Sequence, residues 1–209
     1  NIGVQGQLIM GAIAAGYVGF AWHLPIVIHQ VAALLAGVIG GAFWGGLVGW
    51  LKARTGAHEV ITTIMLNYVA YYFLGYLLGV SGYQAPHSTQ ATSSFIDSSA
   101  QLPNLFEDLH SGIIVAILAA IGCWWLLSHS TLGFTLKAVG ANAFAARTAG
   151  MKIERSYITV MVISGALAPT GLNCNGSITN CTPSGRPIVI DDATYLTKFV
   201  DAGGLNYLD

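Results

Sequence analysis

The sequence predicts an all-α protein, a polytopic membrane helix bundle that is followed by a polar, irregular C-terminal tail. Hydrophobic residues make up 54% of the 209 residues and charged residues only 8%, whereas about 25% of an ordinary soluble domain is charged. The apolar residues are concentrated in long runs between short polar segments. Because the net charge is only −1, the chain lacks the basic surface of a nucleic-acid-binding protein. We therefore expect contact with membrane lipid and no nucleic-acid partner.

Four apolar runs are long enough to cross a bilayer as helices, since about 20 residues span roughly 30 Å of hydrocarbon. A fifth run is shorter, because it begins after Arg155 and stops at Pro169. We expect four full spans and a truncated fifth, at residues 3–24, 26–51, 60–80, 111–128 and 156–168. Tryptophans near span ends are expected to be interfacial anchors: Trp22, Trp50, Trp124 and Trp125.

Lys and Arg residues predict the orientation, because they are concentrated in cytoplasmic segments of membrane proteins. Within residues 1–168 they occur only after the second span and after the fourth. The loop 81–110 contains no Lys or Arg and is expected on the outer side. The residues expected on the cytoplasmic side are Lys52, Arg54, Lys137, Arg147, Lys152 and Arg155.

Glycines line one side of the second span. Gly37, Gly41, Gly45 and Gly49 recur every four residues and therefore share one face of a helix. Small residues at this spacing let a neighbouring helix approach closely, and tight helix packing is their more frequent use. A thin wall beside a translocation path is the alternative.

The third span carries a polar stripe. Thr63, Asn67 and Tyr71 are also four residues apart and lie on one helix face. An intramembrane Asn faces protein or a water-filled cavity, where it bonds a neighbouring helix or meets a solute. Bonding between helices is the more frequent use, and solute contact is the alternative.

Motifs for enzyme chemistry are incomplete in this chain. The HEVIT segment begins like a zinc-protease helix, but Thr62 stands where the second His, four residues after His58, is required. Ser164 in VISGAL has no membrane-embedded His partner. The GANAFAARTAG stretch is no P-loop, because it lacks the Gly-Lys-Ser/Thr sequence whose side chains contact phosphate and its metal ion. We therefore predict no catalytic residue, no metal and no cofactor, with any ATP bound by a separate partner subunit.

The same GANAFAARTAG stretch, residues 140–150, predicts a short capped helix. Asn142 is a good N-cap, and Gly150 can adopt the left-handed conformation that follows a helix. A helix of about two turns is marginal alone and needs packing from outside. Phe144 and Arg147 are suited to a groove on a partner protein, but a helix that lies against its own bundle fits the pattern equally well.

Three blocks of sequence resemble the permease subunits of bacterial ABC importers for nucleosides and simple sugars, of the branched-chain/ribose type. They are NIGVQGQLIMGA at 1–12, LKARTGAHEVITTIMLNYVA at 51–70 and TLGFTLKAVGANAFAARTAGM at 131–151. The resemblance covers about residues 1–168. It implies a multi-pass permease component of an ATP-driven importer in the bacterial cytoplasmic membrane, which performs no bond chemistry. The alternative function is a membrane scaffold that has lost transport.

The resemblance also implies partners and sites. The partners are a cytoplasmic ATP-binding subunit, a second permease subunit and an extracytoplasmic substrate-binding protein. Residues 140–151 would be the segment that couples to the ATPase, through Gly140, Asn142, Phe144, Arg147 and Gly150. Because a nucleoside offers a flat base and ribose hydroxyls, the face of Thr63, Asn67 and Tyr71 is the first candidate for substrate binding. The second candidates are Asn1 and Gln5.

The resemblance ends at about Ala168, and residues 169–209 form a polar, turn-rich tail without a span. Cys174 and Cys181 in this tail could pair in an oxidising compartment. Cys123, within the fourth span, is expected to pack as an apolar residue. The missing start Met and the shortened fifth span predict a fragment of a longer permease, which would not transport by itself.

Overall fold

The computed structural model describes residues 2–56, 58–80, 82–84, 93–94, 99–100, 104–106, 109–110 and 112–171. The predicted Cys174–Cys181 pair lies outside them. The described elements, in chain order, are α1 (Val4–Ala21), α2 (Ile26–Thr55), α3 (Glu59–Leu78), β1 (Asn104–Phe106), β2 (Leu109–His110), α4 (Gly112–His129), α5 (Thr131–Ala141), α6 (Ala143–Thr148), α7 (Ile153–Leu167) and the 3-10 turn η1 (Ala168–Gly171).

The predicted all-α membrane bundle is confirmed. Helices α1 to α4 are each long and apolar enough to cross a membrane, and α7, with 15 residues, is the shorter fifth helix. The antiparallel pair β1–β2 was not predicted from the sequence, and it is only two to three residues per strand. Such a small ladder in the outer loop leaves the fold class unchanged.

Helix boundaries differ from the predicted spans where a helix continues beyond its apolar run or stops before the run ends. The apolar run of α2 stops before Lys52, but the helix continues to Thr55 and is ended by Gly56, whose φ of 64° is left-handed. Glycine adopts this conformation without the steric penalty that a Cβ imposes. Helix α1, in contrast, ends at Ala21, three residues earlier than predicted, and Trp22 is its C-cap.

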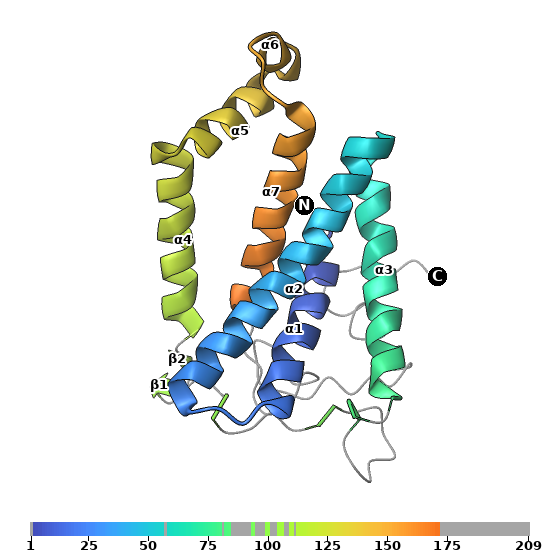
Figure 1. The fold of residues 1–209 in the computed structure, drawn as a ribbon, viewed down its shortest axis with the longest axis vertical. Helices are drawn as coiled ribbons and strands as arrows, with labels where there is room; N and C mark the ends of the chain where they lie inside the picture. Colours follow the sequence, from blue (N-terminus) through green and yellow to red (C-terminus); the bar gives the residue numbers. More distant parts are fainter. Residues whose placement is uncertain are drawn as a thin grey trace, which may run out of the picture.

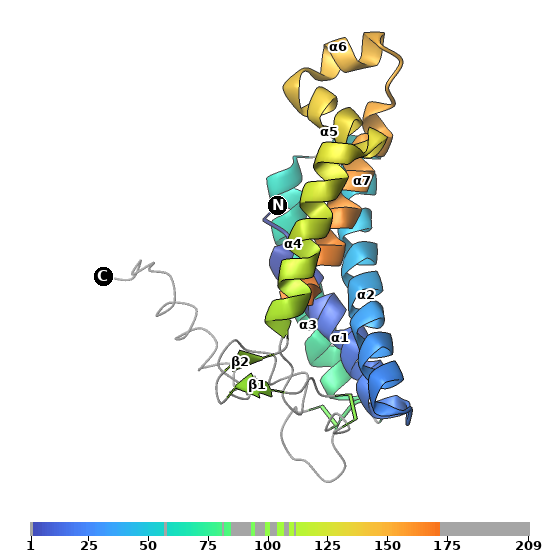
Figure 2. The ribbon, with the colours of Figure 1, turned by 90° about the vertical axis from the view of Figure 1, so that its left-hand side faces the viewer.

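The helices are arranged around α2, which packs against α7 on one side and α1 on the other (Figure 1). Helix α3 packs mainly on α1, and α4 contacts α5 and η1. The end of α2, the start of α3, the start of α7 and both short helices α5 and α6 lie at one end of the bundle, here called the basic end (Figures 1 and 2). All six Lys and Arg residues of the bundle belong to these segments, so their predicted gathering on one side is confirmed.

The glycine stripe of α2 packs directly on the backbone of α7, which confirms the helix-packing interpretation. A Cβ placed on Gly41 would lie 2.2 Å from the carbonyl oxygen of Gly165, and one on Gly45 would lie 2.3 Å from that of Met161. At Gly49 the nearest atom would be Cα of Ile158, at 2.9 Å. We call this contact between α2 and α7 the glycine seam. Gly37, at the other end of the stripe, instead lies against Ala15 and Gly11 of α1.

Two buried polar side chains hold the outer end of the bundle together. The hydroxyl of Tyr83 donates to the carbonyl of Ile13 in α1, and its ring packs edge-to-face on Phe20. His29 in α2 is fully buried. Its ring nitrogens contact the carbonyl oxygen of Val18 at 3.0 Å and the hydroxyl of Ser99 at 2.8 Å. The end of α1 is therefore fixed to α2 and to the segment after α3.

Gly45→Ala is expected to destabilise the protein by about 1–3 kcal/mol, because the added methyl overlaps a backbone carbonyl that cannot rotate away. The matched control is Gly75→Ala in α3, where a Cβ would meet nothing within 4 Å and alanine is the better helix former. Thermal unfolding in detergent, followed by size-exclusion chromatography, measures both. Equal melting temperatures for Gly45→Ala and the wild type would contradict the seam.

Candidate functional site

Helix α6 projects beyond the bundle at the basic end, joined to α5 on one side and α7 on the other (Figure 2). Asn142 ends α5 and begins α6. Its side-chain Oδ1 accepts hydrogen bonds from the backbone N–H of Phe144, at 3.0 Å, and of Ala145, at 3.1 Å. The predicted N-cap is therefore confirmed, and the cap satisfies two of the N–H groups that a helix start leaves unpaired.

The other end of α6 is closed by Gly150, which has a φ of 82°. The N–H of Gly150 donates to the carbonyl of Arg147, and that of Met151 to the carbonyl of Ala146, both at 3.0 Å. This pair of bonds is the Schellman arrangement, which requires a left-handed residue after the helix. The predicted role of Gly150 as a C-terminal stop is confirmed, and both ends of this six-residue helix are held by local bonds.

The two faces of α6 have different environments. Ala146 is buried against the bundle, whereas Phe144 is 85% exposed and Arg147 is also exposed. Gly140, in the last turn of α5, is exposed, and a Cβ there would meet nothing within 4 Å. Helix α6 therefore rests on its own bundle through one face, as one of the two alternatives predicted, and presents an aromatic and a basic side chain on the other. Docking on a partner protein stays a prediction.

The polar stripe of α3 faces the start of α1. Asn67 accepts a hydrogen bond from the N–H of Gly6 at 2.9 Å through Oδ1, and donates through Nδ2 to the carbonyl of Ile2 at 3.0 Å. The N-cap residue of α1 itself, Gly3, has no side chain to offer. Asn67 therefore caps α1 from a different helix, which is the interhelical use predicted for it.

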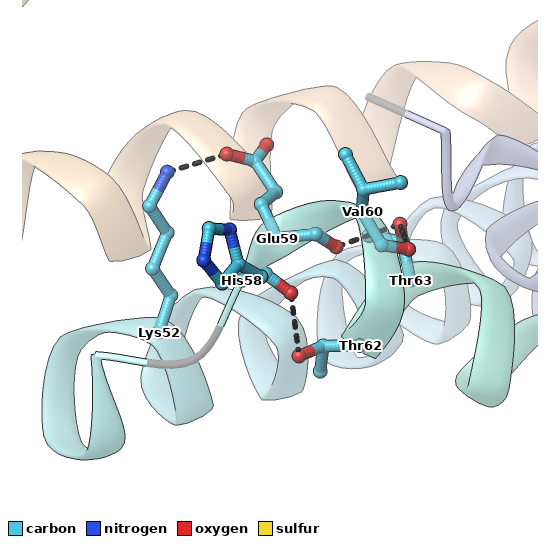
Figure 3. Close-up of polar contacts among 6 residues, drawn as sticks. All are labelled: Lys52, His58, Glu59, Val60, Thr62 and Thr63. Atoms are coloured by element: carbon cyan, nitrogen blue, oxygen red, sulfur yellow. Dashed lines mark hydrogen bonds and ion pairs between the residues drawn. The ribbon is translucent and has the colours of Figure 1, made fainter.

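The other members of the stripe lie on the same side of α3. Thr63 is fully buried, and its hydroxyl lies 2.8 Å from the carbonyl oxygen of Glu59 and 2.9 Å from that of Val60, one turn earlier (Figure 3). Tyr71 is half-buried and packs edge-to-face on Tyr72. Gln5 is also half-buried and lies in the first turn of α1. The residue after it, Gly6, is the one whose N–H donates to Asn67. Asn67 thus lies at the contact of α1 with α3, and Thr63 is one turn earlier on the same face of α3. Asn1 lies outside the described residues.

A further buried polar group, Trp44, was not among the predicted site residues. Its side chain is only 8% exposed, and its Nε1 has no hydrogen-bond partner within the described part of the chain. A Cβ on Gly6 would lie 2.9 Å from this nitrogen and 2.9 Å from Asn67 Oδ1. The available sequence signal is its position in the middle of a span, away from the interface where Trp usually lies.

The HEVIT segment has a structural use at the basic end. Lys52 at the end of α2 forms an ion pair with Glu59 at the start of α3, and the hydroxyl of Thr62 donates to the carbonyl of His58 at 3.1 Å (Figure 3). The Nζ of Lys52 also lies 4.7 Å from the ring centroid of Tyr157 in α7. Lys52 therefore contacts both neighbouring helices. No group of three His, Cys, Asp or Glu residues that could hold a metal occurs among the residues described.

The sequence matches the model of a permease family, described as the branched-chain amino acid transport system permease component, over residues 1–171. It is 42% identical to the guanosine ABC transporter permease protein NupP of Bacillus subtilis, over 80% of this chain and 49% of that protein. It is 35% identical to the glucose ABC transporter permease protein TsgB13 of Haloferax volcanii, over 82% and 48% of the two chains. The nucleoside ABC transporter permease protein NupB of Lactococcus lactis is 34% identical, over 82% and 50%. No solved structure matches this chain.

These matches confirm the resemblance to nucleoside and sugar permeases and the point at which it ends, since residues 172–209 lie outside the family match. The chain spans about half the length of the curated relatives it matches. Their family consists of membrane permease subunits and not of enzymes, and its members lie in the cytoplasmic membrane. With four helices among its described residues that are long and apolar enough to span a membrane, and a family match over residues 1–171, this chain belongs to the family of branched-chain amino acid transport system permease components.

Proposed function

We propose that this chain is part of the permease of an ATP-driven importer for nucleosides or related simple sugars. The relatives named above support this class of solute, because two are nucleoside or guanosine permeases and one is a glucose permease. The single observation that carries the coupling role is α6, a helix capped at both ends that presents an 85% exposed Phe144 beyond the bundle.

The proposed partners follow from this assignment. A cytoplasmic ATP-binding subunit docks on residues 140–151 and binds all the ATP, so that the permease itself needs no cofactor. A second permease subunit completes the translocation path, and an extracytoplasmic substrate-binding protein delivers the solute at the opposite end. The basic end is therefore the cytoplasmic end, in agreement with the preference of Lys and Arg for that side.

Coupling proceeds through backbone contacts. When ATP closes the ATPase pair, α6 moves with the surface on which it docks. Residues 149–152 join α6 to α7, and the glycine seam joins α7 to α2. A displacement of α6 is therefore carried into α2, and the bundle opens first to one side and then to the other.

The proposed solute site is the α1–α3 contact, with Thr63, Asn67 and Tyr71 as its first residues and Gln5 and Asn1 as the second. Amide and hydroxyl groups suit the hydroxyls of ribose, and an aromatic ring suits a base. In the described conformation Asn67 bonds α1 and Thr63 bonds its own helix. Solute therefore gains access to them when α1 and α3 separate.

Phe144→Asp and Arg147→Glu are expected to abolish co-purification of the permease with its ATPase subunit in mild detergent. The first change places a charge in an apolar groove, and the second reverses the charge on the same face. Phe144→Leu should retain association because it keeps an apolar side chain.

The matched control for Arg147→Glu is Arg54→Glu, an exposed basic residue at the end of α2, which lies outside α6. Loss of the ATPase from both charge-reversal variants alike would show that overall basic charge, and not α6, holds the partner. Wild-type permease that retains no ATPase would favour the scaffold alternative.

Thr63→Val is expected to raise the KM for import about three- to tenfold, the loss of one neutral hydrogen bond. The melting temperature should stay the same, because valine keeps the shape of the side chain. Thr62→Val, one residue earlier and likewise bonded to its own helix, is the control. Uptake of labelled solute into proteoliposomes measures KM, and an unchanged value for Thr63→Val would remove Thr63 from the solute site.

A further inference from the structure

Trp44 is a buried hydrogen-bond donor without an acceptor. Its side chain is more than nine-tenths buried, and Nε1 makes no hydrogen bond within the described residues. Leaving such a group unpaired costs about 1–3 kcal/mol, and a buried Trp N–H usually has a partner for this reason. Trp50, near the end of the same helix, is 48% exposed and can meet water at the membrane interface. Trp44 lies too far along α2 to do so.

The donor lies against the first turn of α1. The Cβ position of Gly6 is 2.9 Å both from Nε1 of Trp44 and from Oδ1 of Asn67. The indole of α2 and the amide of α3 therefore meet over the backbone of a glycine. The point where the three helices meet therefore places a donor of α2 beside an acceptor of α3.

The surroundings favour a neutral ligand. Helix α1 contains no charged residue, and the nearest charges along α2 and α3 are Lys52 and Glu59, which pair with each other. Lys52 is two helical turns beyond Trp44, about 12 Å along the axis. A phosphate or carboxylate at this depth would lack a countercharge and would be expensive to desolvate. A hydroxyl group can accept a hydrogen bond and donate another without carrying charge.

We infer that the indole N–H of Trp44 donates to a hydroxyl oxygen of the transported solute, while that hydroxyl donates to Oδ1 of Asn67. This inference rests on the importer function proposed above, and it adds one specific contact, in which Trp44 and Asn67 bind the same hydroxyl of the solute. In the described conformation α1, α2 and α3 close around the two groups. The unpaired donor raises the free energy of this closed state, and a solute hydroxyl removes that penalty once the helices separate.

The test uses the complete importer, with its ATPase and binding protein, in proteoliposomes. The probes are guanosine, its 2′-, 3′- and 5′-deoxy analogues, and glucose with its single-position deoxy analogues. For Trp44→Phe, KM for the parent solute is expected to rise about three- to tenfold. One deoxy analogue should show the same KM in wild type and variant, because the hydroxyl that Trp44 contacts is already missing. Trp50→Phe is the matched control and should leave every KM unchanged.

A second substitution guards against misfolding of the phenylalanine variant. Incorporation of 3-benzothienylalanine at position 44 keeps the shape of the indole and replaces only the N–H. Without solute its melting temperature should equal or exceed that of the wild type, because no bond within the protein is lost. A lower melting temperature together with unchanged discrimination among the analogues would overturn the inference.

The two levels of the proposal fail differently. If the wild-type importer takes up neither guanosine nor glucose, the importer assignment for these solutes is wrong and the role of Trp44 falls with it. A second outcome is normal uptake in which each deoxy analogue raises KM by the same factor in wild type and in Trp44→Phe. The importer assignment is then supported, and Trp44 is not a solute contact.

Discussion

The glycine seam is the contact on which the rest of the fold depends. Helices in lipid gain little from apolar burial, because lipid tails are as apolar as their side chains. Close packing and polar bonds between helices are the remaining sources of affinity, and the closest backbone approach requires the absence of side chains. Gly41 and Gly165 meet this requirement mutually, since a Cβ on either would lie 2.2 Å from the carbonyl oxygen of the other. The shorter α7 is thereby held along α2 by close backbone contact.

The contacts of α3 are of a different kind. The amide of Asn67 holds the start of α1, and the carboxylate of Glu59 holds Lys52 at the basic end. Such directional polar bonds can be broken and replaced by bonds to water or solute at little net change in free energy. Steric fit along a seam cannot be exchanged in this way. We therefore expect α2 and α7 to move together during transport, and α3 to separate from its neighbours.

The sequence predicted the helices, the glycine packing and both caps of α6 because each depends on local spacing. Asn142 and Gly150 form hydrogen bonds with residues two to four positions away, so their roles can be predicted from the local sequence. Spacing also placed Asn67 on an inward face, but it could not name the start of α1 as the partner, because that contact joins residues 61 positions apart. Trp44 was missed because a hydropathy pattern treats tryptophan as an apolar residue. Its indole N–H is notable only when the structure shows that it is buried without an acceptor among the described residues.

A polar side chain that is already bonded within the protein is still able to contact solute. An amide has two lone pairs on its oxygen and two N–H groups. Asn67 uses one of each, for Gly6 and Ile2. The hydroxyl of Thr63 donates its only hydrogen to its own helix, which leaves its oxygen free to act as an acceptor. When α1 and α3 separate, Asn67 exchanges its bond from the start of α1 for a bond from a solute hydroxyl to the same oxygen. Structural and solute roles then alternate, because the oxygen that joins the two helices in the closed state is the one that the solute occupies in the open state.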